Sequence, residues 1–328
     1  MAIAIYFLLA STASLVKGVN FMPCYLCEPK PFSEALDVAS MRLLWEVYES
    51  SDDKNVLISP LGVFTLLSLY VSNVKGQVAD EIVDFLAAAN NTQASMKTKG
   101  KINNIVSEDD ITYDLIVALY NVIYFKGHWD VPFNENFTRE KCFLTDDFQL
   151  IKKPMMNLLQ SMYYYEDEEA GFRMIQLPYK ESKLKMVVVL PSHLDGLSMV
   201  LRQLSATGLL RYVNRMNHSE IEINLDLPRF EIKSKYDLQN VLSKVGISSI
   251  FHESVYGIVN EFPVSVDKVF QEAFITVDEK GSTAGQVTGL HIVPFSALPH
   301  AIPFKVDRPF LFAILYDDIV LFAGTFSH

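Results

Sequence analysis

The spacing of apolar residues divides the chain into a helical first part and a strand-rich remainder. From Phe32 to about Leu86, apolar positions recur at helical intervals, as in "ALDVASMRLLWEVYES" and "GQVADEIVDFLAAA". After Thr112 the pattern changes to β-branched and aromatic runs such as "YDLIVALYNVIYF", which predict strands. No linker-like stretch divides the chain, so the pattern predicts one α+β domain with large sheets over residues 32–328.

Several boundaries are predicted by local signals. Ser59 followed by Pro60 is typical of a helix N-cap and first turn. The runs "FRMIQLPY" and "KLKMVVVLPS" predict a hairpin around "KESK", and "RPFLFAILYDDIVLFAGTF" predicts a strand pair joined by Asp317 and Asp318. The segments "EIEINLDLPRFEIK" and "QEAFITVDE" predict further strands, with a helix "DLQNVLSKVGISSIF" between them.

Composition and charge restrict the partners. With 328 residues, of which 50% are hydrophobic and 20% charged, the chain can bury a large core. The net charge of −11, from 39 acidic and 28 basic side chains, argues against nucleic acid and against an anionic membrane surface. The expected partner is therefore a protein or a small molecule.

The first 18 residues, "MAIAIYFLLASTASLVKG", predict a signal peptide and hence a secreted, extracellular protein. Their start lacks the usual positive side chain, so a buried N-terminal helix is the alternative. Cys24 and Cys27 form either a local disulfide or two free thiols. Three glycosylation sequons, which begin at Asn90, Asn136 and Asn217, fit a secreted glycoprotein but also arise by chance.

The sequence carries no clear catalytic or metal-binding motif. The chain lacks a GxSxG elbow, an HExxH motif and a Gly-rich phosphate loop. His291 and His300 lie in an irregular stretch that favours a solvated loop over a metal site, and "YEDEEAG" lacks the spacing of a calcium loop. We therefore expect neither an enzyme nor a metal ion or other cofactor.

The segment "DEKGSTAGQVTG" follows a predicted strand with a run of small residues. A segment that must enter a packed sheet as a new strand needs small side chains, because large ones would clash with the closed interior. This run resembles the reactive-loop hinge of a serpin. Five further segments resemble serpin segments in the family's order: "NVLISPLGVFTLLSL", "YNVIYFKGHWDVPF", "LPYKESKLKMVVVLPS", "LDLPRFEIKSKYDLQNVLSKVGISSIF" and "DRPFLFAILYDDIVLFAGTF".

The resemblance implies the serpin fold and a suicide-substrate inhibitor of serine proteases, with an exposed reactive loop at about residues 279–303. It assigns the hinge to Glu279, Gly281, Ser282, Thr283 and Ala284. Counting from Glu279 as the first residue, the seventeenth is Phe295, so Phe295-Ser296 is the expected reactive bond and Leu298 the alternative. A Phe there fits the hydrophobic specificity slot of a chymotrypsin-like protease. The expected partner is a chymotrypsin- or elastase-like serine protease.

Two departures from the family pattern concern loop insertion. Gln286 lies on the strand face that would enter the core, where an unpaired amide costs up to about 1–3 kcal/mol. Where many serpins carry a His, this chain has Gln271, which we expect to hydrogen-bond with Asn121 and Ser59 in the region where the sheet opens.

A larger departure is a gap between "DEIVDFLAAA" and "YDLIVALYNVIYF", where roughly 70 residues of the usual serpin chain are missing, too many for a loop variation. The missing elements would be the first two strands of the main sheet and the helix that covers it. The strand "YDLIVALYNVIYF" would then lie at the sheet edge. The alternatives to an inhibitor are a non-inhibitory serpin that binds or stores another molecule, and an inactive truncated splice product.

Overall fold

The computed structural model describes residues 32–71, 74–87, 118–125, 127–180, 183–256, 263–281 and 301–328. Its first helices are the three predicted ones, α1 (Phe32–Ser50), α2 (Pro60–Val71) and α3 (Gln77–Ala87). Ser59 caps α2 as predicted, because its Oγ accepts a hydrogen bond from the Gly62 amide at 3.3 Å. None of the helices that the structure describes is long and apolar enough to cross a membrane.

The largest sheet has seven strands in the order β1-β14-β13-β7-β6-β5-β8. Both predicted hairpins lie in it, since β6 pairs antiparallel with β7 and β13 with β14. Along β7, Val187 and Val189 pack into one core cluster, whereas Val188 and Leu190 pack into a second. The uninterrupted apolar run therefore reflects burial of both sheet faces. The bounds of the strands are Leu57–Ile58 (β1), Tyr163–Asp167 (β5), Phe172–Pro178 (β6), Leu184–Pro191 (β7), Asn217–His218 (β8), Phe310–Tyr316 (β13) and Ile319–Phe326 (β14).

A second sheet has four strands in the order β12-β9-β4-β3. Its bounds are Arg139–Leu144 (β3), Leu150–Gln160 (β4), Ile223–Pro228 (β9) and Ile302–Lys305 (β12). The sequence pattern did not predict β3, because its first four residues are exposed and lack alternation. The predicted strand region "EIEINLDLPRFEIK" is split at Arg229, so its first half is β9 and its second half belongs to another sheet.

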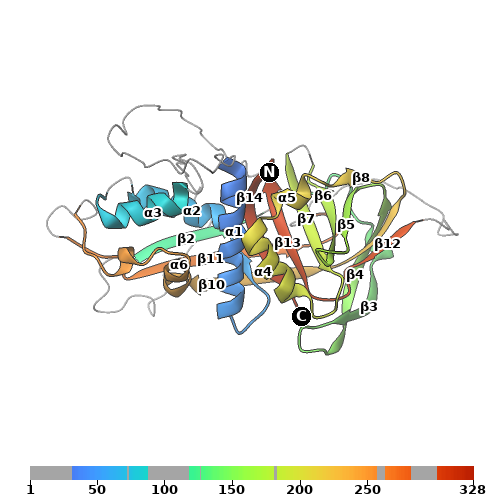
Figure 1. Cartoon of the computed structure of the whole chain (residues 1–328). Coiled ribbons are helices and arrows are strands. Elements are labelled where there is room, and N and C mark those ends of the chain that lie inside the picture. The colour runs from blue at the N-terminus through green and yellow to red at the C-terminus, as the bar shows by residue number, and fades with distance from the viewer. Residues whose placement is uncertain are drawn as a thin grey trace.

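The third sheet has three described strands in the order β10-β11-β2, with bounds Phe230–Asp237 (β10), Lys268–Val277 (β11) and Ala118–Tyr124 (β2). Strand β10 runs antiparallel to β11, whereas β2 runs parallel to it, in a register that places Asn121 opposite Gln271. In the described part of the chain β2 pairs with β11 alone, so it lies at the edge of this sheet, as the gap in the sequence predicts. Figure 1 shows this sheet extending away from the other two, with α2 and α3 along β2.

The remaining helices are α4 (Leu197–Thr207), α5 (Leu210–Val213) and α6 (Gln239–Lys244), with 3-10 turns at Glu135–Phe137 and Ser249–Phe251. The sequence pattern predicted one continuous helix over "DLQNVLSKVGISSIF", which is wrong. Gly246 adopts a φ of 101°, in the left-handed region that ends helices. The segment therefore forms α6 and a separate 3-10 turn.

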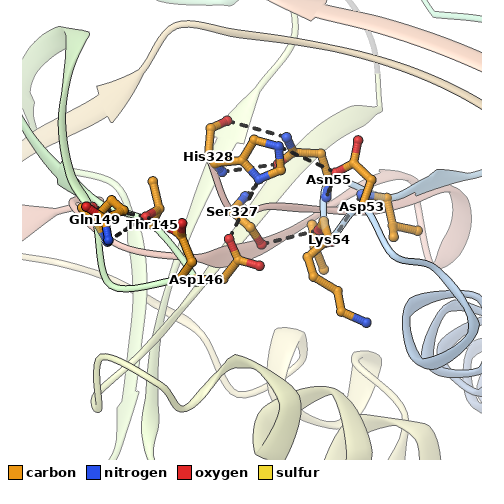
Figure 2. A network of polar contacts seen from close by, with 11 residues as sticks. Asp53, Lys54, Asn55, Thr145, Asp146, Gln149, Ser327 and His328 are labelled. Atoms are coloured by element: carbon orange, nitrogen blue, oxygen red, sulfur yellow. Dashed lines mark hydrogen bonds and ion pairs between the residues drawn. The ribbon is translucent and has the colours of Figure 1, made fainter.

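A polar network joins the end of β14 to two other segments (Figure 2). The Asn55 Oδ1 accepts hydrogen bonds from the amides of Ser327, at 2.7 Å, and His328, at 3.3 Å. The His328 imidazole lies between two carboxyl groups: its Nε2 is 3.6 Å from the Asp53 Oδ1, and its Nδ1 is 3.7 Å from the Asp146 Oδ1. The network thus ties the α1–β1 connection and the β3–β4 turn to the residues after β14.

Candidate functional site: the end of β11 and the sheet it borders

The chain makes a tight turn directly after β11. The amide of Asp278 donates to the Gly281 carbonyl at 2.9 Å, and the Asp278 Oδ1 accepts from the amides of Lys280 and Gly281. Gly281 has a φ of 130°, and a Cβ there would collide with the backbone of Gly127 and His128. A glycine is therefore required at this predicted hinge position, because the backbone is left-handed and lies against another segment.

Glu279, the first predicted hinge residue, lies buried at this turn with 3% of its surface exposed. Its Oε1 accepts a hydrogen bond from Thr138 Oγ1 at 2.7 Å and forms an ion pair with Arg229 at 2.5 Å. Burial alone would raise the pKa of Glu279, but the hydrogen bonds from Arg229 and Thr138 outweigh it, so the pKa lies below its ordinary value. The carboxylate is charged at neutral pH and holds three segments together.

The segment before β3 also grips the backbone of this turn. The Phe133 amide donates to the Glu279 carbonyl at 2.8 Å, and the Trp129 amide donates to the Lys280 carbonyl at 3.1 Å. The Trp129 Nε1 donates to the Asp278 carbonyl at 2.9 Å. The turn is thus held to residues 129–138, which follow β2 along the chain, so separation of β2 from β11 would strain these contacts.

Lower in the same sheet, Gln271 joins β11 to the start of α2. Its side chain is fully buried, its Nε2 donates to the Ser59 carbonyl at 2.9 Å, and its Oε1 accepts from the Ser59 amide at 2.9 Å. The Ser59 hydroxyl in turn donates to the Leu321 carbonyl on β14 at 2.7 Å. The predicted contact between Gln271 and Ser59 is therefore present, through the Ser59 backbone.

Asn121 on β2 does not take the predicted part in this contact. Its Nδ2 is buried and has no hydrogen-bond partner, so the expected bond from Asn121 to Gln271 is wrong. Both polar atoms of the Gln271 amide are already engaged with Ser59. Asn121 instead lies against Gly62 of α2, where a Cβ would overlap its amide. The structure brings the three residues together, but Asn121 contributes packing.

Sequence reasoning did not identify Arg229 and Thr138 as partners of Glu279. In the sequence, Thr138 belongs to the sequon that begins at Asn136, and Arg229 lies within a predicted strand region. The available signal was the charged Arg229 between two apolar runs in "LPRFEIK", which the prediction of one strand region did not use. Its partner could not be inferred, since Arg229 and Glu279 lie far apart in the sequence.

Several predicted site residues lie outside the described residues. These are the reactive bond Phe295-Ser296, the alternative Leu298, the hinge residues Ser282, Thr283 and Ala284, and Gln286, which differs from the family pattern. The sequon residue Asn90, the cysteines Cys24 and Cys27, and the histidines His291 and His300 also lie outside the described residues. The sequons at Asn136 and Asn217 are described, and both asparagines are exposed. In the described part of the chain, no cluster of His, Cys, Asp and Glu side chains could hold a metal ion.

The profile described as "Serpin (serine protease inhibitor)" matches residues 87–328. The chain belongs to the serpin family. It is 31% identical to human Serpin B3 over 304 residues, which cover 87% of this chain and 77% of that protein. It is 30% identical to Antichymotrypsin-2 of Bombyx mori over 267 residues, which cover 80% of this chain and 71% of that protein.

The fold is that of solved serpins. The crystal structure of Serpin48 from the insect Tenebrio molitor superimposes with a TM-score of 0.74 at 22% identity and covers 90% of this chain and 98% of that one. Serpins are described as protease inhibitors, a class that acts upon enzymes and is not enzymatic itself. A protease inhibitor of this kind needs no catalytic group of its own.

Proposed function

We propose that this serpin is a suicide-substrate inhibitor of a chymotrypsin-like serine protease, cleaved at Phe295-Ser296. The observation that carries the proposal is the parallel pairing of β2 with β11. After β11 the chain turns at Asp278–Gly281 and leaves this sheet. The chain re-enters a different sheet at Ile302, on β12. Residues 282–301 thus connect two sheets and are the stretch in which a protease would cut.

The sheet geometry suits insertion of the cut loop. A chain that reverses direction after β11 runs antiparallel to β11, and hence also antiparallel to β2, because these two strands are parallel. A strand placed between them would gain ladder hydrogen bonds on both sides. At roughly 1 kcal/mol net per bond, a strand of about 15 residues gains on the order of 10–20 kcal/mol. Insertion also breaks the present β2–β11 ladder and the contacts made by Trp129, Phe133 and Gln271, so the net gain is smaller than this value.

The target class rests on the side chain at position 295. An aromatic side chain fills an apolar specificity slot, whereas a slot with an acid at its base selects Lys or Arg. The name of Antichymotrypsin-2 agrees with such a target, but other relatives at similar identity carry other names, including an antitrypsin from the same organism. The proposed specificity therefore depends on Phe295 and is tested there.

The deciding experiment incubates the purified protein with chymotrypsin and, separately, with trypsin. We expect a complex with chymotrypsin that survives boiling in detergent, joined by an ester between the protease serine and the Phe295 carbonyl. Phe295→Arg should move complex formation to trypsin, since only the side chain in the specificity slot changes. Leu298→Arg is the matched control and should leave the chymotrypsin complex unchanged. Cleavage after Leu298 instead would place the reactive bond there.

The second candidate is a non-inhibitory serpin that binds or stores another molecule. It is favoured by the position of β2 at the sheet edge in the described part of the chain, because a sheet without outer strands gives less support for trapping a protease. An inactive truncated splice product would show the same edge. Cleavage of the loop without a stable complex, and without a rise in melting temperature, would favour these alternatives over inhibition.

We also propose that the protein is secreted after removal of about 18 residues, as one domain from residue 32 onward, and glycosylated. The support is the apolar start of the chain and the exposed positions of Asn136 and Asn217. Mass spectrometry of protein from a eukaryotic culture medium tests both points. A mature chain that begins between about Ser14 and Phe21, and glycopeptides that contain Asn136 or Asn217, are the expected results. Retention of Met1 would contradict secretion through this segment.

A further inference from the structure

Asp37 is a buried carboxyl group with no role in the loop or its sheet. It lies on α1, where this helix packs against α4 and the connection from α4 to α5. Only 3% of its surface is exposed. We propose that Asp37 is a proton-controlled contact, which docks α1 firmly onto the α4–α5 connection when the carboxyl is neutral and loosens that docking when it is charged.

The hydrogen bonds of Asp37 are too few to satisfy a buried carboxylate. Its Oδ2 accepts from the Leu210 amide at 2.7 Å, at the start of α5. Its Oδ1 is buried and has no hydrogen-bond partner. A buried carboxylate needs donors on both oxygens to offset the loss of hydration, so the charged form is incompletely solvated here.

The connection also passes too closely for water or a cation to reach the carboxyl from that side. Gly208 has a φ of 77°, and a Cβ at this residue would overlap the Asp37 carboxyl group and approach Val38. The backbone of residues 208–210 therefore covers the carboxyl directly. This close approach explains why a glycine ends α4 and why Asp37 is shielded from solvent.

The charges around Asp37 do not favour its ionised form either. From its own helix, Glu34 lies one turn earlier and repels a negative charge at Asp37. From the α4–α5 connection, the groups that favour the charge are the backbone amides of Leu210 and Leu209. No basic side chain in the described part of the chain acts on it. Burial, with a smaller contribution from Glu34, raises the pKa of Asp37 to about 7 in spite of the opposing hydrogen bonds from the Leu210 and Leu209 amides.

The direction of the pH effect follows from this shift. The folded protein keeps the proton up to about pH 7, whereas the unfolded chain releases it near the ordinary pKa of 3.8. Between these two values the folded state holds the extra proton, so stability falls as the pH rises, by up to roughly tenfold in the unfolding equilibrium per pH unit. Above pH 7 the effect of this group is constant. The docking of α1 is thus tightest at mildly acidic pH.

The test compares the intact protein with Asp37→Asn in urea at pH 5, 6, 7 and 8. Asparagine keeps the shape and the acceptor for the Leu210 amide but cannot ionise. We expect the variant to gain stability relative to the original protein as the pH rises, by roughly tenfold per unit up to pH 7, with no further gain at pH 8. Hydrogen exchange of the peptide that contains residues 209–213 should show the same trend locally.

Two further variants keep the inference falsifiable. Asp195→Asn removes an exposed charge just before α4 and should show no such trend. Glu34→Gln leaves Asp37 in place but removes the nearby negative charge, so the pH at which the stability stops falling should move to a lower value. This measurement does not depend on whether Asp37→Asn folds. A stability difference between Asp37→Asn and the original protein that stays constant from pH 5 to pH 8, or a midpoint of the pH dependence that Glu34→Gln does not move, would overturn the inference.

Discussion

Gln271 holds both the amide and the carbonyl of Ser59, in two hydrogen bonds of 2.9 Å that fix β11 to the first turn of α2. Both residues are buried, and the Ser59 amide has the Gln271 Oε1 as its acceptor. Because α2 also packs against β2, the contact controls how β11 can move relative to β2. It is therefore a brace across the place where a loop strand would enter.

The first prediction is that Gln271→Leu destabilises the native protein by about 1–3 kcal/mol, since the buried Ser59 amide loses its acceptor. The measurement is the midpoint of unfolding in urea, monitored by intrinsic fluorescence. If the brace restrains the sheet, the variant should also insert its loop or self-associate faster on mild heating. Glu272→Gln, on the neighbouring and partly exposed position of β11, is the control. Equal urea midpoints for Gln271→Leu and the original protein would refute this role.

The second prediction concerns the ion pair between Arg229 and Glu279. Arg229→Ala leaves a buried carboxylate with Thr138 as its remaining side-chain partner and should lower stability by about 1–3 kcal/mol at pH 7. The pKa of Glu279 is lowered in the folded protein, so its contribution is present above its ordinary pKa of 4.5 and is lost as the pH falls through the folded value.

This sign gives the ion-pair prediction a second readout. The stability difference between the original protein and Arg229→Ala should shrink as the pH falls below about 4.5, when Glu279 takes up a proton. Lys233→Ala removes an exposed partner of Glu272 and is the matched charge control. A difference that stays constant from pH 7 to pH 3 would show that Arg229 acts through packing and not through its charge.

The sequence predicted most of the strands and helices because their apolar runs are long. Through the gap in the serpin resemblance it also predicted the edge position that β2 has among the described strands. It could not predict the cluster around Glu279. Thr138, Arg229 and Glu279 come from three distant segments, and each has an ordinary surface-type side chain. The burial of Asp37 could likewise not be predicted, since an acidic residue on an amphipathic helix is normally exposed to solvent. Burial and distant pairing are properties of the packed chain.

The third prediction concerns Gly62, a glycine inside α2. Gly→Ala within a helix normally stabilises by about 0.5–1 kcal/mol. Here a Cβ would overlap the side chains of Asn121 and Ile123 on β2, so Gly62→Ala should instead destabilise or displace β2. The double variant with Asn121→Ala should recover part of the loss, because the crowded amide is gone. Stabilisation by Gly62→Ala alone would show that β2 yields without cost.

The last prediction separates loop insertion from loop cleavage. Ser282 is the first residue after the turn at Gly281 and is the first proposed to enter the sheet. Ser282→Arg should leave the rate of cleavage at Phe295 unchanged, because the scissile bond lies far along the loop. It should nevertheless abolish the detergent-stable complex, since an unpaired buried charge costs several kcal/mol and stalls insertion while the acyl-enzyme hydrolyses. Ser282→Ala is the control and should retain the complex. If both variants form the complex equally well, insertion does not begin at Ser282, and the hinge proposed for this serpin is misplaced.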